Sequence, residues 1–145
     1  KILDEFYYKL DVDEQTERGR SIDESTLEWW GTQDPKVIEA AMGSEGRSAV
    51  TDFLEEFKRW CVGASNFWAQ GPTFDMCMLE NLYLQYDKNY PWPFWTVRDS
   101  RTLFSIMPND PRKEMNFDAH DALEDCKAQA KCVQYSLDYL GLKIK

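Results

Sequence analysis

The sequence has few of the features that place a protein in a membrane or attach it to nucleic acid by charge. It contains no run of about 18 apolar residues, so the pattern predicts no membrane-spanning helix. Its 17 Lys and Arg are outnumbered by 26 Asp and Glu, which gives a net charge of −9. Such acidity argues against a broad basic surface for nucleic acid. It is compatible with a small site in which carboxylates hold metal ions against a phosphate.

Cysteine and histidine are also scarce, and their spacing excludes the common zinc sites. The four cysteines (Cys61, Cys77, Cys126 and Cys132) form no CxxC pair and have no histidine partner at zinc-site spacing. We therefore predict free thiols in a reducing, cytoplasmic compartment. Cys126 falls on the apolar stripe of the last helical segment, so we expect it to be buried as a small hydrophobic residue.

Apolar and aromatic residues are plentiful, and their spacing predicts an α/β fold. With 43% hydrophobic and 14% aromatic residues, 145 residues can form one compact domain, 1–145, with a sizeable core. Strand patterns alternate with helical ones, an order typical of helices packed on a sheet. The strand patterns cover 1–12, 65–70 and 94–97, and the helical patterns cover 24–30, 35–43, 48–61, 74–86, a short segment after Asp99, and 121–140.

The ends of these segments carry recognisable signals. We expect Asp23 or Ser25 to cap the helix at 24–30, and Thr73 to cap the helix at 74–86. Asp34-Pro35 would start another helix and Gly43 would end it. The first strand pattern is at full strength from Lys1, which suggests that an earlier strand of the sheet precedes it.

Three aspartates and the only histidine cluster at the start of the last helical segment. We expect Asp118 to be the cap, and the apolar stripe to comprise Leu123, Cys126, Ala130, Val133, Leu137 and Leu140. Asp121 and Asp125 share a different face. They are either solvated acids that favour the positive end of the helix dipole or parts of a site. His120 is likewise either a surface residue or a base that titrates near neutrality.

Asp75 occupies a second position where a site can form. It follows the strand pattern 65–70 and begins a helix, and ligand sites in open α/β sheets form at such junctions. The alternative is an ordinary first-turn aspartate that complements the helix dipole.

These residues lie in segments that resemble a known family. "PTFD", ending at Asp75, and "HDALED", from His120 to Asp125, resemble the second and third motifs of DEDDh 3′-5′ exonucleases of the RNase H-like superfamily. "STLEWW", "WAQGPTFD" and "VRDSRTL" are most similar to the small mycobacterial-type exoribonuclease group and to phage exonuclease A. The resemblance covers essentially the whole chain. It implies an RNase H-like mixed sheet flanked by helices.

The resemblance also implies a mechanism. Asp125 and Asp75 would be ligands of two Mg²⁺ or Mn²⁺ ions, and His120 would be the general base. The substrate would be a single-stranded RNA or DNA 3′ end that is cut to 5′-mononucleotides, and a homodimer would be in keeping with many relatives. The family's D-x-E motif is absent from the printed sequence. We expect either that the chain lacks its first strand, or that it is an inactive relative that binds nucleic-acid ends.

Three residues are candidates for substrate binding. Such an enzyme needs rings that stack on terminal bases and donors that face phosphates. Trp30, Phe74 and Arg101 could supply these groups. The alternatives are a tryptophan that is partly buried in the core and an arginine in a structural ion pair.

The two interpretations of the acidic cluster predict different mutants. If His120 is the base of a nuclease, His120→Ala lowers the rate of oligonucleotide cleavage by at least about 10²-fold. If the cluster is only surface charge, His120→Ala and Asp125→Ala leave every activity unchanged. Initial rates on a labelled oligonucleotide distinguish the two.

Overall fold

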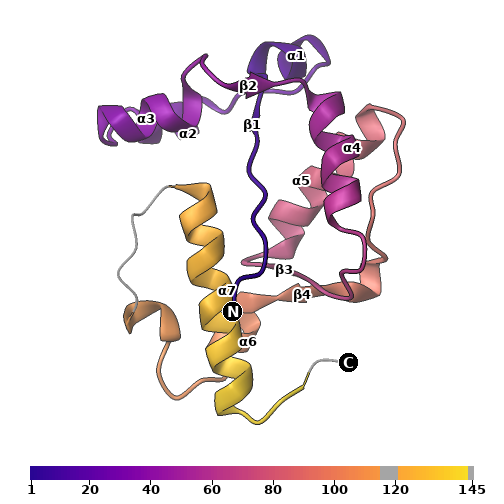
Figure 1. Ribbon diagram of the computed structural model, residues 1–145. Helices are drawn as coiled ribbons and strands as arrows, with labels where there is room; N and C mark the ends of the chain where they lie inside the picture. Colours follow the sequence, from indigo (N-terminus) through magenta and orange to yellow (C-terminus); the bar gives the residue numbers. More distant parts are fainter. Residues whose placement is uncertain (115–120, 144–145) are drawn as a thin grey trace. The chain divides into compact units, whose positions relative to one another are not determined.

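The computed structural model describes residues 1–114 and 121–143, in which helices predominate over short strands (Figure 1). Its internal contacts divide the chain into two units. The first unit is Phe6–Trp60, and the second comprises Lys1–Glu5 together with the residues from Cys61 onward. Within the described ranges, no helix is both long and apolar enough to cross a bilayer.

The first unit is mostly helical. Strand β1 (Lys9–Leu10) pairs in parallel with β2 (Arg47–Ser48), and Lys9 lies opposite Arg47. The helices are α1 (Val12–Glu17), α2 (Glu24–Trp30), α3 (Pro35–Met42) and α4 (Val50–Trp60). On α4, the periodic residues Val50, Phe53 and Leu54 are buried, as the apolar spacing predicts.

Local capping signals in this unit correctly predict where helices begin. The carboxylate of Asp23 accepts a hydrogen bond from the Thr26 amide at 2.8 Å and caps α2. Asp34 accepts from the Lys36 amide at 2.8 Å and caps α3, which then begins at Pro35. Gly43 is the C-cap of α3, as expected.

The second unit contains the longer helices and a second parallel pair of strands. Strand β3 (Phe67–Ala69) pairs with β4 (Val97–Asp99), so that Ala69 lies opposite Asp99. The other elements are α5 (Pro72–Gln85), η1 (Phe94–Thr96), α6 (Ser100–Ser105), η2 (Pro111–Glu114) and α7 (Ala122–Tyr139). Helix α5 contacts both strands, and α7 contacts α6 and η2. The core joins Leu103 and Phe104 of α6 to Cys132 and Val133 of α7.

The described residues thus confirm an α/β protein with helices and small parallel sheets. The first strand is much shorter than the sequence pattern predicts. Only Lys9–Leu10 forms a ladder, and helix α1 follows at Val12 because the Asp11 side chain accepts from the Glu14 amide at 2.9 Å. Residues 1–8 join no ladder in the described part of the chain, and Glu5 instead forms an ion pair with Lys127 of α7 at 3.0 Å.

Two further boundaries differ from the expected ones. Gly71, not Thr73, is the N-cap residue of α5, because Pro72 already occupies the first turn. The segment 94–97 is mostly a 3₁₀ turn, in which the Thr96 amide donates to the Pro93 carbonyl at 3.0 Å, and β4 starts only at Val97.

Helix α7 buries a face that agrees with the expected stripe only in part. Val133 is buried, and Leu137 and Leu140 pack against the core, as expected. Cys126 is exposed, whereas Ala128, Cys132, Val133 and Ser136 are buried. The prediction that Cys126 is buried is therefore wrong, because packing against α6 and η2 selects the buried face. Asp121 is the N-cap, in place of Asp118, which lies outside the described residues.

Helix α5 offers a matched test of the packing. Leu82 is 4% exposed and Leu84 is 60% exposed on the same helix. We expect Leu82→Ala to lower the free energy of unfolding by about 2–5 kcal/mol, because it leaves a cavity. Leu84→Ala should cost less than about 1 kcal/mol. Urea unfolding followed by tryptophan fluorescence measures both, and equal losses would contradict this packing.

Candidate active site

The carboxyl ends of β3 and β4 lead directly into helices. Because the strands are parallel and Ala69 lies opposite Asp99, the starts of α5 and α6 lie at the same edge of the pair. Such edges are where open α/β sheets form their ligand sites. Asp75, in the first turn of α5, is therefore at a position suited to a site.

Gly71 makes the turn from β3 into α5. Its φ of +113° is one that residues with a side chain rarely adopt, so the position favours glycine. The Gly71 carbonyl accepts hydrogen bonds from the amides of Phe74 at 2.9 Å and Asp75 at 3.3 Å. The turn therefore fixes the backbone of Asp75.

The surroundings of Asp75 act on its charge in opposite directions. Desolvation raises the pKa of the Asp75 carboxyl above its ordinary value, and the positive charge of Arg101 opposes this shift. Arg101 also donates from its guanidinium to the Gln70 carbonyl at 3.4 Å. The positive charge of Arg101, at the start of α6, thus acts on Asp75, at the start of α5.

The start of α7 supplies the second acid. Asp121 caps the helix by accepting from the amides of Leu123 at 3.0 Å and Glu124 at 2.9 Å. Asp125 lies one turn further and is half-buried, and its own amide donates to the Asp121 carbonyl at 2.9 Å. The side chain that caps α7 is therefore that of Asp121.

The thiol of Cys126 responds to the charges of both acids. The pKa of its thiol is raised first by desolvation, then by the charge of Asp125, and then by that of Asp75. Both carboxylates therefore lie within electrostatic range of one sulfur atom, although α5 and α7 are far apart in the sequence. Asp75 and Asp125 thus both act on Cys126, and sequence reasoning did not identify this thiol as part of their surroundings.

The other expected members of the site have different placements. His120 lies outside the described residues. Phe74 is 68% exposed, next to Asp75. Trp30 belongs to the first unit, where it is half-buried and stacks edge-on against the more exposed Trp29, with ring centroids 5.2 Å apart.

Carboxylates are suitable donors for hard divalent cations. In the part of the chain that the structure describes, however, no group of three or more His, Cys, Asp or Glu side chains could hold a metal ion. Asp75 and Asp125 therefore fit a metal site in chemistry but are too few to form one alone.

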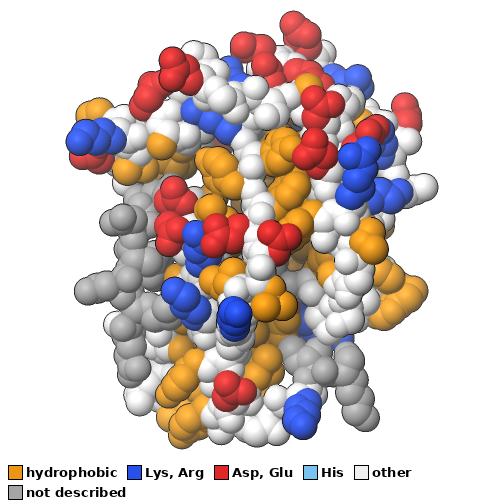
Figure 2. Space-filling model, in the orientation of Figure 1, with side chains coloured by type: hydrophobic (Ala, Val, Ile, Leu, Met, Phe, Trp, Pro, Cys, Tyr) orange, Lys and Arg blue, Asp and Glu red, His pale blue; other side chains and the backbone are white. Residues whose placement is uncertain are grey.

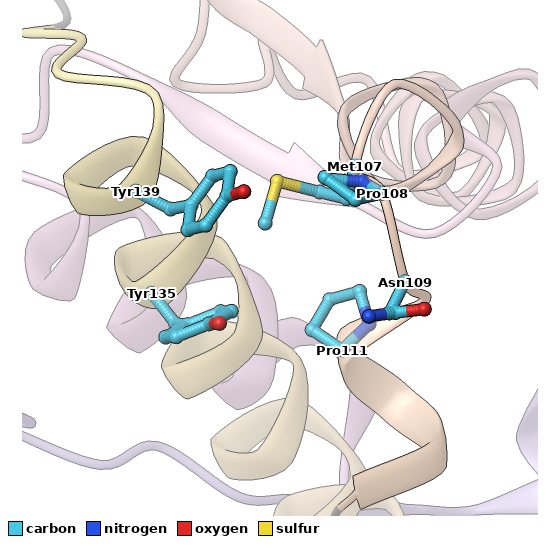
Figure 3. Close-up of a pocket in the computed structure, with 6 residues that line it drawn as sticks. All are labelled: Met107, Pro108, Asn109, Pro111, Tyr135 and Tyr139. Carbon is cyan, nitrogen blue, oxygen red and sulfur yellow. The ribbon is translucent and has the colours of Figure 1, made fainter.

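A shallow pocket and the distribution of surface charge do not extend the candidate site. A shallow pocket of about 50 Å³ is lined by Met107, Pro108, Asn109, Pro111, Tyr135 and Tyr139 (Figure 3). Tyr135 lies roughly 15 Å beyond Asp125 along the axis of α7. On the face drawn in Figure 2, acidic and basic side chains of the described residues are interspersed, and the basic side chains form no continuous patch.

Comparison with known proteins decides the family. A profile of the Rv2179c-like 3′-5′ exoribonuclease domain matches residues 1–137. The chain belongs to this family. It is also similar to the exodeoxyribonuclease of Enterobacteria phage T4, with 27% identity over 166 residues that cover 93% of this chain and 73% of the phage protein. No solved structure matches the chain significantly. The resemblance to mycobacterial-type and phage exonucleases is therefore confirmed.

The shared neighbourhood of the two acids can be tested through Cys126. Removing a negative charge with Asp75→Asn or Asp125→Asn should lower the pKa of the thiol. More thiolate is then present at pH 8, and iodoacetamide should react faster with Cys126. The exposed Cys77 is replaced by serine beforehand, and peptide mass spectrometry follows alkylation at Cys126.

Glu124→Gln is the matched control on α7, because Glu124 pairs with Lys127 at 2.8 Å and is not among the groups that shift the thiol. An unchanged alkylation rate in Asp75→Asn would show that α5 and α7 do not meet at this sulfur.

Proposed function

We propose that the protein is a metal-dependent 3′-5′ exonuclease that releases 5′-mononucleotides from single-stranded RNA or DNA ends. Its family supports the reaction class. The observation that carries the proposal is that Asp75 and Asp125 both act on the thiol of Cys126. Acids from separate helices are part of the ligand set that this hydrolysis would require.

Asp75 and Asp125 would hold Mg²⁺ or Mn²⁺ through carboxylate oxygens. When bound, two such ions lower the pKa of the attacking water and stabilise the leaving oxygen. Further oxygen ligands are needed, because the described residues contain no third ligand and the printed sequence has no D-x-E. Phosphate oxygens of the substrate would supply part of this set.

The remaining residues would handle the proton and the substrate. His120 would accept the proton of the attacking water, as a base that titrates near neutrality. The exposed ring of Phe74, which precedes Asp75 in the first turn of α5, would stack on a terminal base. Arg101, whose positive charge acts on Asp75, would face a phosphate of the bound strand. Trp30 is proposed as a second stacking ring.

The second candidate is a module that binds nucleic-acid ends without cutting them. The absence of D-x-E from the printed sequence favours it, because that motif supplies two of the four acids in the resembling family. Both candidates use the same stacking and phosphate contacts. They differ in whether the bound strand is shortened.

Degradation of labelled oligonucleotides tests the proposal. With Mg²⁺, 5′-labelled single strands should give a ladder that shortens from the 3′ end, and a chelator should abolish it. Asp125→Asn and Asp75→Asn should each lower the rate by at least about 10²-fold. Asp138→Asn, an exposed acid in the last turn of α7, is the control and should leave the rate unchanged.

RNA and DNA strands of the same sequence give the preference for the sugar. Retention of both strands at full length, with measurable binding by fluorescence anisotropy, would favour the binding module instead.

A further inference from the structure

The short turn η1, which leads into β4, carries two exposed aromatic rings. Phe94 is 78% exposed and Trp95 is 65% exposed. Their ring centroids are 5.1 Å apart, and the planes of the rings are nearly perpendicular, at 85°. We call Phe94 and Trp95 the ring pair. Adjacent apolar side chains that stay this exposed mark a surface that is suited to binding.

The turn that carries the ring pair is held in place on both sides. Before it, Trp92 is 2% exposed, and its indole N–H donates to the Glu80 carboxylate of α5 at 2.9 Å. After it, the amide and the hydroxyl of Thr96 both donate to the Pro93 carbonyl, at 3.0 Å and 2.7 Å. The rings are therefore presented on a fixed backbone, and a ligand that binds them has little of the protein to order.

A guanidinium lies beside the ring pair. Arg98 of β4 donates to the Trp95 carbonyl at 2.6 Å and to the Val97 carbonyl at 3.1 Å. Both bonds come from the same nitrogen, Nη1, and a guanidinium has further N–H donors on its other nitrogens. Aromatic rings next to a positive charge are the combination that binds a base together with its phosphate.

A single strand of nucleic acid fits the ring pair better than another protein does. A stable protein interface buries about 800 Å² on each partner, whereas the exposed run at this turn is limited to residues 93–95. The protein carries a net charge of −9, and the basic side chains in Figure 2 form no continuous patch, so contacts with phosphates alone would hold a strand weakly. Stacking on aromatic rings supplies affinity without a broad positive surface.

Strand β4 connects the ring pair to the proposed active site. The ring pair precedes the strand, and Asp99 ends it at the edge where α5, with Asp75, begins. At that edge, the buried Ser100 hydroxyl donates to the Ala69 carbonyl at 3.2 Å and ties the two strands together. Trp95 and Asp99 are separated by at most roughly 13 Å of extended chain. Since stacked bases advance about 3.4 Å each, a strand whose 3′ end lies at Asp75 would reach the ring pair about four nucleotides upstream.

We propose that the ring pair is a stacking subsite for the single-stranded substrate. It would hold a base about four nucleotides from the 3′ end, with Arg98 on a neighbouring phosphate. The inference rests on the proposed function for the direction of the strand. It adds that the protein binds strands of several nucleotides through a second contact that a dinucleotide is too short to reach.

Binding to strands of different length tests the subsite. Trp95→Ala should raise the Kd of a single strand of about eight nucleotides by about 5- to 150-fold, because one stacked base is lost. The Kd of a dinucleotide should change by less than about twofold, since it does not reach the ring pair. Trp95→Phe keeps a ring and should recover most of the affinity. Fluorescence anisotropy in the presence of a chelator measures both Kd values without cleavage.

Tyr139→Ala is the matched control, because Tyr139 is an exposed ring, at 58%, on α7 of the same unit. It should leave the Kd of both strands unchanged. An unchanged Kd of the longer strand in Trp95→Ala, or an equal loss with the dinucleotide, would overturn the proposal. If size-exclusion chromatography shows that Trp95→Ala converts a dimer into a monomer, a second copy covers the rings and the proposal fails.

Salt dependence distinguishes the rings from the guanidinium. Arg98→Gln should lower the slope of log Kd against log salt concentration by about 0.7, the value of one phosphate contact with a single strand. Trp95→Ala should weaken binding without changing this slope, because stacking neutralises no phosphate. The same slope in Arg98→Gln as in the wild-type protein would overturn the role of Arg98.

The binding measurements keep this inference separate from the proposed function. If the wild-type protein binds the longer strand but does not shorten it with Mg²⁺, the exonuclease function fails, and the Kd values still decide whether the ring pair is a subsite. If the protein shortens the strand and Trp95→Ala retains the wild-type Kd, the subsite fails and the exonuclease function stands.

Discussion

The parallel pairing of β3 with β4 is the constraint on which the proposed site depends. Its register sets Ala69 opposite Asp99, so two helices begin at adjacent points of one edge. A shift of one residue would turn the alternate side chains of a strand to the other face. It would also separate Ser100 from the carbonyl that it reaches. The register of two strands only a few residues long thus determines where Asp75 and Arg101 lie.

Electrostatics at this edge differ from those of the chain as a whole. The protein carries a net charge of −9, yet Asp75 has the guanidinium of Arg101 in range. Desolvation and the positive charge act against each other on the same carboxyl. A cation brought between Asp75 and Asp125 would relieve the repulsion between these acids, which is why acidic clusters suit divalent ions. Acidity of the whole chain is therefore no obstacle to binding a phosphate.

The sequence was most informative where structure is decided locally. Asp23 and Asp34 start their helices as expected, because a cap depends on residues within a few positions of it. Asp75 and Asp125 were identified from motif resemblance, and the charges of both act on the thiol of Cys126. The buried face of α7 was predicted only in part: Val133 is buried as expected, whereas contacts with α6 and η2 bury Cys132 and leave Cys126 exposed. Gly71, rather than Thr73, is the N-cap of α5 for a similar reason: its turn depends on the strand that precedes it.

The two acids also connect chemistry to folding. Asp75 is carried by α5 and Asp125 by α7, and about fifty positions of the chain separate them. In an unfolded chain such residues are on average far apart, and closing the intervening loop costs entropy. The proposed cation site would consequently form only when α5 and α7 have both folded into place. Catalytic turnover would therefore report on a folded second unit, and a newly synthesised chain would be inactive until α7 had left the ribosome.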